Sequence, residues 1–389
     1  LVTREPYPRL PVDISTVFIV SAAIGADATS EDFNTGKAAI GTGPYRLIRW
    51  QHGDRLELVR HDGYWGRLPD FENVSIRFIP NDAARVAALL TATADIIDAV
   101  PPFDLERFRA RRDLRVYSKA TVTLIYLHLD SARAQTPFVT AHDGSVLAAN
   151  PLRDSRVRHA LSLAIDRDLL IDKILMGAGV PAAQIAPAGL RGFSPAVAAP
   201  AHDPAKARAL LAAAGYPQGF RITLHATNNR YLNDALVAQA LAIMLSKVGV
   251  ATAVEAMPRN VFLPRATNRA FSVMLYGYGS VTGDALMALK GVLGTPDAAL
   301  GRGANNRGGY SNAALDALIA AAEMTAEEDE SEALTMQAAA LAAADMGIIP
   351  LYHQTANWAS TASVTFLPRA DERTLAYMVR RVQPAENAP

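Results

Sequence analysis

Cysteine is absent from this chain of 389 residues. Its absence excludes disulfide bonds, thiolate metal sites and cysteine nucleophiles. A chain without thiols suits an oxidising compartment, although many cytosolic proteins share this property. The eight histidines are scattered along the chain and form no HExxH-type pair. The sequence therefore predicts no direct binding of a metal ion.

An excess of charge of either sign is absent as well. Lysine plus arginine and aspartate plus glutamate both number 38. A balanced chain produces no field that would attract nucleic acid or an anionic membrane, so neither is expected as a partner. No uncharged apolar run reaches about 18 residues, and no membrane-spanning helix is predicted. The first residues, LVTREPYPRL, show neither a methionine nor a signal peptide, which predicts a processed chain or one that begins within a longer protein.

The chain does contain enough apolar sequence for two lobes. Half of its residues are hydrophobic and its mean hydropathy is +0.09, values typical of a soluble globular protein, and its length exceeds that of a single hydrophobic core. Strands dominate up to about residue 120. YRLIRW and RLELVR alternate around QHGD, which predicts a β-hairpin, and NVSIRFIP predicts a further strand. A helix is expected to follow, capped by Asn81 or Asp82.

From about residue 151 the pattern changes to capped helices and buried strands. Asp154, Asp166 and Asp203 each precede a helical stretch and are expected to be N-caps. The strands FRITLHAT, ATAVEAM and FSVMLYGYG alternate with amphipathic helices, which predicts an α/β layer with parallel pairing. Two alanine-rich helices and the strand IIPLYHQ follow, and the tail TLAYMVRRVQP is expected to be β again.

Several landmarks in order along the chain resemble the extracytoplasmic solute-binding proteins of the peptide/nickel class, family 5, which serve ABC importers. The stretches that carry the resemblance are GTGPYRLIRWQHGDRLELVRHDGYWG, RDSRVRHALSLAIDRDLLIDKILMGAG, DPAKARALLAAAGYPQGF, GGYSNAALDALI and IIPLYHQTANW. The resemblance implies an α/β fold of the type II periplasmic-binding-protein kind, with two lobes of mixed sheets flanked by helices. It also implies that the N-terminal subdomain of the family is missing here. Lobe I would comprise residues 1–122 and 351–389, and lobe II residues 123–350.

The resemblance also implies a function without catalysis or cofactor. A monomeric periplasmic protein would capture a small solute, peptide-like or otherwise carboxylate-bearing, by hinged closure of its lobes. It would then deliver the solute to an ABC permease and its ATPase. Two alternatives stay open: an α/β hydrolase-type enzyme, for which no local signature aligns a nucleophile with a base, and a sensory or interaction protein on the same scaffold.

The stretch VMLYGYGSVTGD joins a strand to a helix through glycines, a setting that can bind phosphate. However, its Gly-x-Gly-x-x-x-Gly spacing differs from the dinucleotide fingerprint, and an isolated glycine motif is weak evidence. By resemblance, Tyr278 is an aromatic platform for the ligand, and Val281 replaces an aspartate that pairs with a peptide ammonium group. Asp284 would either take over that role or cap the next helix. We include the hydroxyls of Ser280 and Thr282 in the predicted site.

Two further segments supply candidate ligand contacts. Arg230 and Tyr231 follow the strand FRITLHAT, and ligands collect at such strand ends in open α/β sheets. By resemblance, Arg230 holds a ligand carboxylate, a task that suits its planar fork. Trp358, on the strand that returns to lobe I, is either a stacking contact or a core residue. Tyr126 and His128 are expected on one face of their strand.

Overall fold

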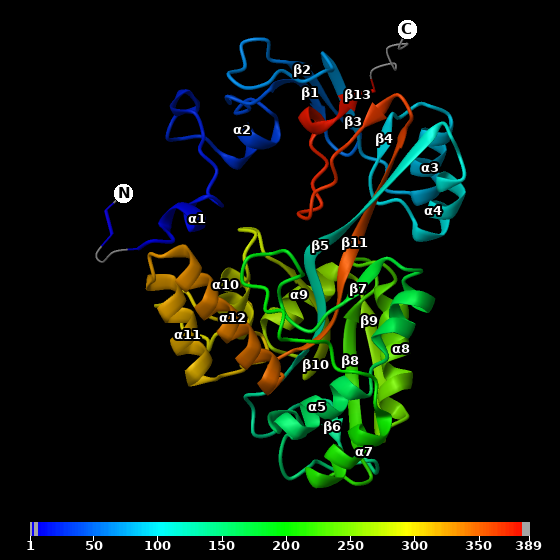
Figure 1. Ribbon diagram of the computed structural model, residues 1–389, viewed down its shortest axis with the longest axis vertical. Coiled ribbons are helices and arrows are strands. Elements are labelled where there is room, and N and C mark those ends of the chain that lie inside the picture. The colour runs from blue at the N-terminus through cyan, green and yellow to red at the C-terminus, as the bar shows by residue number, and fades with distance from the viewer. Residues whose placement is uncertain (1, 4–6, 383–389) are drawn as a thin grey trace. The chain divides into compact units, whose positions relative to one another are not determined.

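The computed structural model describes residues 2–3 and 7–382, and the chain divides into two compact units (Figure 1). Unit 1 is Leu1–Thr16 with Ala120–Thr355, and unit 2 is Val17–Lys119 with Ala356–Pro389. The chain thus changes unit within a few residues of the lobe boundaries expected at 122/123 and 350/351. The first sixteen residues group with unit 1, whereas we expected them in lobe I.

Seven strands of a mixed eight-stranded sheet, β5 to β11, lie wholly or partly in unit 1. The order of this sheet is β4-β11-β5-β10-β8-β6, with β7 beside β11 and β9 beside β8. β8 is parallel to β9 and β10, whereas β10 is antiparallel to β5. The strands are β4 (Ile96–Ile97), which lies in unit 2, β5 (Leu114–Leu129), β6 (Val139–Thr140), β7 (Gly179–Pro181), β8 (Phe220–Thr227), β9 (Val250–Met257), β10 (Val273–Gly279) and β11 (Ile349–Thr361).

Helices cover both faces of this sheet. Asp154, Asp166 and Asp203 each cap a helix through a side-chain oxygen, as predicted. The helices of unit 1 are α1 (Leu10–Ile14), α5 (Ser155–Leu163), α6 (Arg167–Leu169), α7 (Pro204–Ala213), α8 (Asp234–Ser246), α9 (Arg259–Thr267), α10 (Ala285–Ala288), α11 (Ala313–Met324) and α12 (Glu328–Asp345). α6 and α10 continue into the π-helical turns Leu170–Ile174 and Leu289–Leu293, and Pro151–Arg153 forms a 3₁₀ turn.

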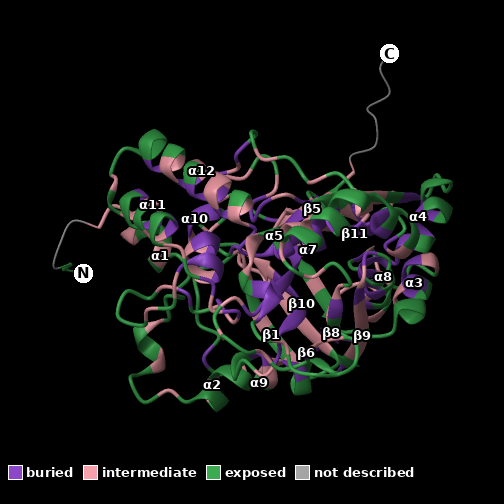
Figure 2. Ribbon diagram, turned by 90° about the horizontal axis from the view of Figure 1, so that it is seen from below, coloured by how far each residue is buried: buried purple, intermediate pink, exposed green. Residues whose placement is uncertain are grey.

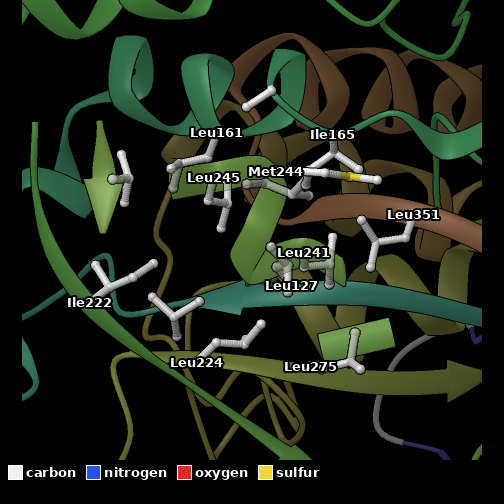
Figure 3. Packing of buried hydrophobic residues seen from close by; sticks show 14 of the residues in the cluster. Leu127, Leu161, Ile165, Ile222, Leu224, Leu241, Met244, Leu245, Leu275 and Leu351 are labelled. Carbon is white, nitrogen blue, oxygen red and sulfur yellow. The ribbon is translucent and has the colours of Figure 1, made fainter. Parts of the chain in front are cut away.

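The alternation of side chains along β5 separates two cores. Ile125 and Leu127 face a core shared with α5, α7 and α8 (Figure 3). Leu124 and Tyr126 face the opposite core, which includes residues of α9 to α12. Each fully buried aliphatic side chain stabilises the fold by about 1.5–3 kcal/mol, and most of β10 is buried between the two layers (Figure 2).

Unit 2 contains the predicted hairpin. β1 (Tyr45–Gln51) and β2 (Arg55–Arg60) pair antiparallel, and β3 (Asn73–Arg77) extends them. Its helices are α2 (Ser30–Asn34), α3 (Asp82–Leu90), for which Asn81 is the cap, and α4 (Pro102–Arg109); Ala22–Ile24 is a 3₁₀ turn.

The tail of unit 2 is less β-like than we expected. It contains the 3₁₀ turn Ala376–Met378 and the two-residue strand β13 (Arg380–Arg381), which pairs with β12 (Val364–Thr365). Across residues 2–3 and 7–382, the helices are too short or too polar to cross a membrane.

Candidate functional site

The loop that follows β8 is held by one buried carboxylate, Asp234. Its Oδ2 accepts a hydrogen bond from the Thr227 hydroxyl at 2.6 Å and from the backbone amide of Arg230 at 3.0 Å. The amide of Tyr231 also donates to it, at 3.3 Å. A charge-assisted acceptor with several donors fixes a loop more firmly than neutral hydrogen bonds do. The backbone of Arg230 and Tyr231 is therefore organised before any ligand binds.

Arg230 and Tyr231 form a cation–aromatic pair at this strand end. The Nε of Arg230 donates to the Tyr231 hydroxyl at 2.6 Å, and the guanidinium carbon lies 5.0 Å from the ring centroid. Burial raises the pKa of Tyr231, and the positive charge of Arg230 opposes that shift. Within the described residues, the terminal nitrogens of Arg230 have no hydrogen-bonded or ion-paired partner. These nitrogens form the part of a guanidinium that can bind a carboxylate with two parallel hydrogen bonds.

The glycine at the end of β10 makes room for that tyrosine. The Tyr231 hydroxyl donates to the carbonyl of Gly277 at 3.3 Å. A Cβ on Gly277 would lie 2.7 Å from the Tyr231 hydroxyl and 2.8 Å from the side chain of Ile125. Such distances are well below van der Waals contact, so position 277 accepts only glycine without a shift of its neighbours. Packing of an aromatic ring, and not a phosphate cradle, accounts for this glycine.

The segment after Gly277 carries four of the predicted contacts. Tyr278 is partly buried, and burial together with the nearby charge of Asp284 raises its pKa. The hydroxyls of Ser280 and Thr282 lie 3.2 Å apart, and Ser280 is almost completely buried. Of the predicted residues, Tyr231 contacts Gly277 directly, whereas Tyr278 follows Gly277 along β10 with its side chain on the opposite face of the strand.

Asp284 caps α10, and both of its carboxylate oxygens have partners. Oδ1 accepts from the amide of Met287 at 3.1 Å, and Oδ2 accepts from the guanidinium of Arg9 at 2.7 Å. The capping interpretation is confirmed, whereas a contact between Asp284 and a ligand stays a prediction. Such a contact would have to share or displace Arg9.

Trp358 lies in the core of unit 2. Its ring is buried among Val364, Phe366 and Val379, and its indole N–H donates to the Thr374 hydroxyl at 2.9 Å. This environment is that of a core residue, so the site proposed below omits Trp358.

Comparisons with known proteins identify the family. The model of the "Bacterial extracellular solute-binding proteins, family 5 Middle" matches residues 1–299. The chain belongs to this family.

Two curated proteins are similar to this chain. The glutathione-binding protein GsiB of Pectobacterium atrosepticum is 30% identical over 304 residues, which cover 76% of this chain and 55% of the relative. The dipeptide-binding protein of Escherichia coli K12 is 27% identical over 248 residues, 63% of this chain and 43% of the relative. The family 5 chain therefore spans about half the length of the curated relatives that it matches.

A solved structure confirms the predicted fold. The periplasmic binding protein DppA of Helicobacter pylori, in complex with the peptide STSA, matches with a TM-score of 0.76 at 21% identity. The match covers 97% of this chain and 71% of that one. The family 5 chain thus has the two-lobed α/β architecture of type II periplasmic binding proteins.

Sequence reasoning missed two arginines beside the predicted residues of this family 5 chain. Arg9 pairs with Asp284 across 275 positions, and no local pattern signals such a contact. Arg307 lies over the ring of Tyr276, on the strand that carries Tyr278. In the sequence, Arg307 lies in the glycine-rich segment GANNRGG, a composition that predicts only an ordinary loop. Within the described part of the chain, no group of three His, Asp or Glu side chains is arranged to bind a metal ion.

Proposed function

We propose that this family 5 chain is the solute-binding component of an ABC importer. It captures a peptide-like or other carboxylate-bearing solute outside the cytoplasmic membrane, acts as a monomer without cofactor or catalysis, and delivers the solute to a permease and its ATPase. Hinged closure of two lobes, with ligand binding that favours the closed state, is the mechanism that we propose for capture.

The observation that carries this proposal is the open guanidinium of Arg230. It follows the carboxyl end of β8, its loop is fixed by Asp234, and its terminal nitrogens have no partner in the described residues. A partly buried cation without a counter-ion gains most from an anionic ligand. The names of relatives add support for the solute class, because glutathione and peptides both carry carboxylates.

Calorimetric titration of the full chain with STSA, a dipeptide and glutathione tests the proposal, each compound being compared with its carboxyl-amidated form. We expect at least one free acid to bind and its amide to bind more weakly. Arg230→Gln should weaken binding of the acid about tenfold or more, since a charge-assisted hydrogen bond contributes about 1.5–3 kcal/mol.

Arg259→Gln is the matched control, because Arg259 is exposed and its side chain has no partner in the described residues. Native mass spectrometry of the purified chain supplements the panel by revealing any solute that copurifies. The proposal fails if no compound binds and none copurifies, or if Arg230→Gln binds the free acid as the unaltered protein does.

A further inference from the structure

A cavity of about 530 Å³ lies between α5 and α7 in unit 1. These two helices pack against each other at one end of the unit (Figure 1). Residues of α5, of α7, of the segment just before α7 and of the end of α12 line the cavity, which we call the α5–α7 cavity. Small-molecule sites have volumes of about 300–1,000 Å³. The α5–α7 cavity therefore has the size of a ligand site.

Hydrogen bonds hold the walls of the α5–α7 cavity at both of its ends. At one end, the amide of Asp203 donates to the carbonyl of Leu163 at 2.9 Å. At the other end, Nη1 of Arg156 donates to the carbonyl of Ala213 at 2.8 Å. The start of each helix is thus tied to the end of the other, so the helices run antiparallel. The lining of α5 extends over residues 155–163, about 12 Å along a helix axis. The cavity is therefore an elongated groove whose walls are fixed before a ligand binds.

Apolar side chains line the cavity from every wall. They are Leu163 on α5, Leu210 on α7, Pro200 and Ala201 in the segment before α7, and Met346 at the end of α12. Met346 is buried, whereas Leu163 and Leu210 are only partly buried. An apolar chain lying along the groove would remove the remaining surface of these side chains from water, which is favourable. The apolar part of a ligand would therefore supply most of its affinity.

The lining also contains a cation that is free to pair with an anion. The ammonium group of Lys206 has no hydrogen-bonded or ion-paired partner among the described residues. Arg156, the other cation, pairs with Asp154 at 2.6 Å. The carboxylate of Asp203 accepts a hydrogen bond from the amide of Lys206 at 2.9 Å as the N-cap of α7, and the dipole of this helix start offsets its charge. Lys206 therefore provides the contact for an anionic group.

His159 does not provide a contact for a second anionic group. Its Nδ1 lies 2.8 Å from the carbonyl oxygen of Ser155. A carbonyl can only accept, so Nδ1 carries the hydrogen and Nε2 of the neutral ring is an acceptor. Because Arg156 is already paired as well, the cavity suits a ligand with one anionic group.

We propose that the α5–α7 cavity binds a linear monocarboxylic acid of medium chain length. The alkyl chain lies along the groove between the two helices, and the carboxylate pairs with Lys206. The elongated shape favours a chain over a compact ring, and walls on several sides favour a small molecule over a helix of another protein. The cavity shares no residue with the candidate site, so this ligand is separate from the solute of the proposed function.

Calorimetric titration of the full chain with octanoate, octanol and butanoate tests the proposal. We expect octanoate to bind saturably. Butanoate should bind about tenfold more weakly or worse, because its shorter chain covers less apolar surface. Octanol should bind about two- to fivefold more weakly than octanoate, since a solvent-exposed ion pair contributes little. Lys206→Gln should remove this difference between the acid and the alcohol.

Ala201→Trp locates the ligand in the cavity. Ala201 is exposed, so a larger side chain there can occupy the groove without displacing the core. We expect this variant to bind octanoate about tenfold more weakly or worse, because the indole takes up the space of the chain. Ala205→Trp, at an exposed position of α7 outside the lining, is the matched control and should bind octanoate as the unaltered protein does. Binding of peptides or glutathione should be the same in both variants.

Leu210→Glu guards against a failure of Ala201→Trp to fold, because it places a carboxylate in the apolar lining and should also weaken binding. The proposal is overturned if the unaltered protein does not bind octanoate, or binds octanol as tightly. It is also overturned if Ala201→Trp and Leu210→Glu both bind octanoate as the unaltered protein does.

Two other occupants would also overturn the proposal. If Arg230→Gln abolishes octanoate binding while Ala201→Trp retains it, the acid binds in the candidate site. If sedimentation shows a dimer that Leu210→Glu dissociates, a second copy of the chain covers the groove.

Discussion

At the scale of single residues, the carboxylate of Asp284 connects a helix start to a distant arginine. One oxygen caps α10 and the other pairs with Arg9, whose side chain is mostly buried. Asparagine caps helices about as well as aspartate does, whereas alanine loses roughly 1 kcal/mol at such a position. We expect Asp284→Asn to lower the free energy of unfolding by about 1–2 kcal/mol through the lost ion pair, and Asp284→Ala to lower it by about 1 kcal/mol more.

Urea unfolding of Asp284→Asn, Arg9→Gln and the double variant measures this coupling. If the ion pair is the main role of the second oxygen, Arg9→Gln should cost little once Asp284 is replaced. If the two substitutions lower the free energy of unfolding additively in the double variant, Arg9 and Asp284 are not coupled through an ion pair. Loss of solute affinity in Asp284→Asn, with stability preserved, would instead support Asp284 as a ligand contact.

The buried hydroxyl of Tyr126 gives a second prediction at this scale. It has no hydrogen-bond partner among the residues that the structure describes, whereas the hydroxyl of Tyr310 donates to Asp345 at 2.7 Å. Removing an unsatisfied buried hydroxyl is neutral or stabilising, while removing a hydrogen bond to a charged group costs about 1.5–3 kcal/mol. Tyr126→Phe should therefore unfold at the same or a higher urea concentration, and Tyr310→Phe at a lower one. Similar losses in both variants would show that Tyr126 has a partner in solution.

Local chemistry explains which residues sequence reasoning could place. Helix caps such as Asp154 and Asp203 act within about three residues, so their side chains could be assigned from the sequence alone. The partners Arg9 and Asp284 are separated by 275 positions, and Arg307 meets Tyr276 only through the fold. Contacts of this kind depend on how strands and loops are brought together, which a single sequence does not display.

At the scale of elements, the end of β10 depends on the space beside Gly277. Gly277→Ala would force apart the ring of Tyr231 and the side chain of Ile125. Overpacking of this kind costs about 1–3 kcal/mol, and displacement of Tyr231 should also weaken solute binding through Arg230. Calorimetry and urea unfolding of the variant measure the two effects.

Gly279→Ala is the matched control on the same strand. A Cβ there would lie 3.1 Å from the Thr123 hydroxyl oxygen, its nearest neighbour, so the clash is milder. We expect Gly279→Ala to lose clearly less stability and less solute affinity than Gly277→Ala. If both variants lose equal stability and equal solute affinity, any added side chain on this strand has the same effect. The space for Tyr231 beside Gly277 would then not be the cause.

The spacing of apolar side chains in the sequence predicted most of the helices and strands. The elements that it did not predict are those that depart from regular helix or strand geometry. The hairpin of β1 and β2, the strands β8 to β10 and the capped helices all follow from side-chain patterns. The π-helical turns Leu170–Ile174 and Leu289–Leu293 were not predicted, because a π-turn needs no distinct composition. The tail pairs over only two residues, since a 3₁₀ turn at Ala376–Met378 interrupts the expected strand.

At the scale of the whole molecule, the two units carry different spectroscopic and titrating groups. The three tryptophans, Trp50, Trp65 and Trp358, all belong to unit 2. The buried histidines His128, His225 and His353 all belong to unit 1. Tryptophan fluorescence therefore reports on unit 2, while most helical signal comes from unit 1, so the stability of each unit can be followed separately. The strand-rich pattern of the sequence ends near residue 120, where the chain changes unit, whereas the lobe boundary expected at 350/351 came from the family resemblance, and the grouping of residues 1–16 with unit 1 was not expected.

The buried histidines predict that unit 1 loses stability as the pH falls. Burial lowers the pKa of His128 to about 3 and that of His353 to about 4, and it also lowers the pKa of His225. In the unfolded chain these imidazoles titrate near a pKa of about 6.5. Below about pH 6.5 these histidines are therefore protonated in the unfolded state but stay neutral in the folded state. The free energy of unfolding should fall by about 1.4 kcal/mol per pH unit for each such histidine until its folded pKa is reached.

Urea unfolding between about pH 7.5 and pH 5, followed by circular dichroism and by tryptophan fluorescence, checks this prediction. We expect the midpoint seen by circular dichroism to fall with pH more steeply than the midpoint seen by fluorescence. His353→Gln should reduce the slope of unit 1, because it removes one of the groups that protonate only on unfolding, whereas His142→Gln, at an exposed position, should not. If both probes shift together, the units unfold as one body. If His353→Gln leaves the slope unchanged, His353 does not contribute to the acid sensitivity of unit 1.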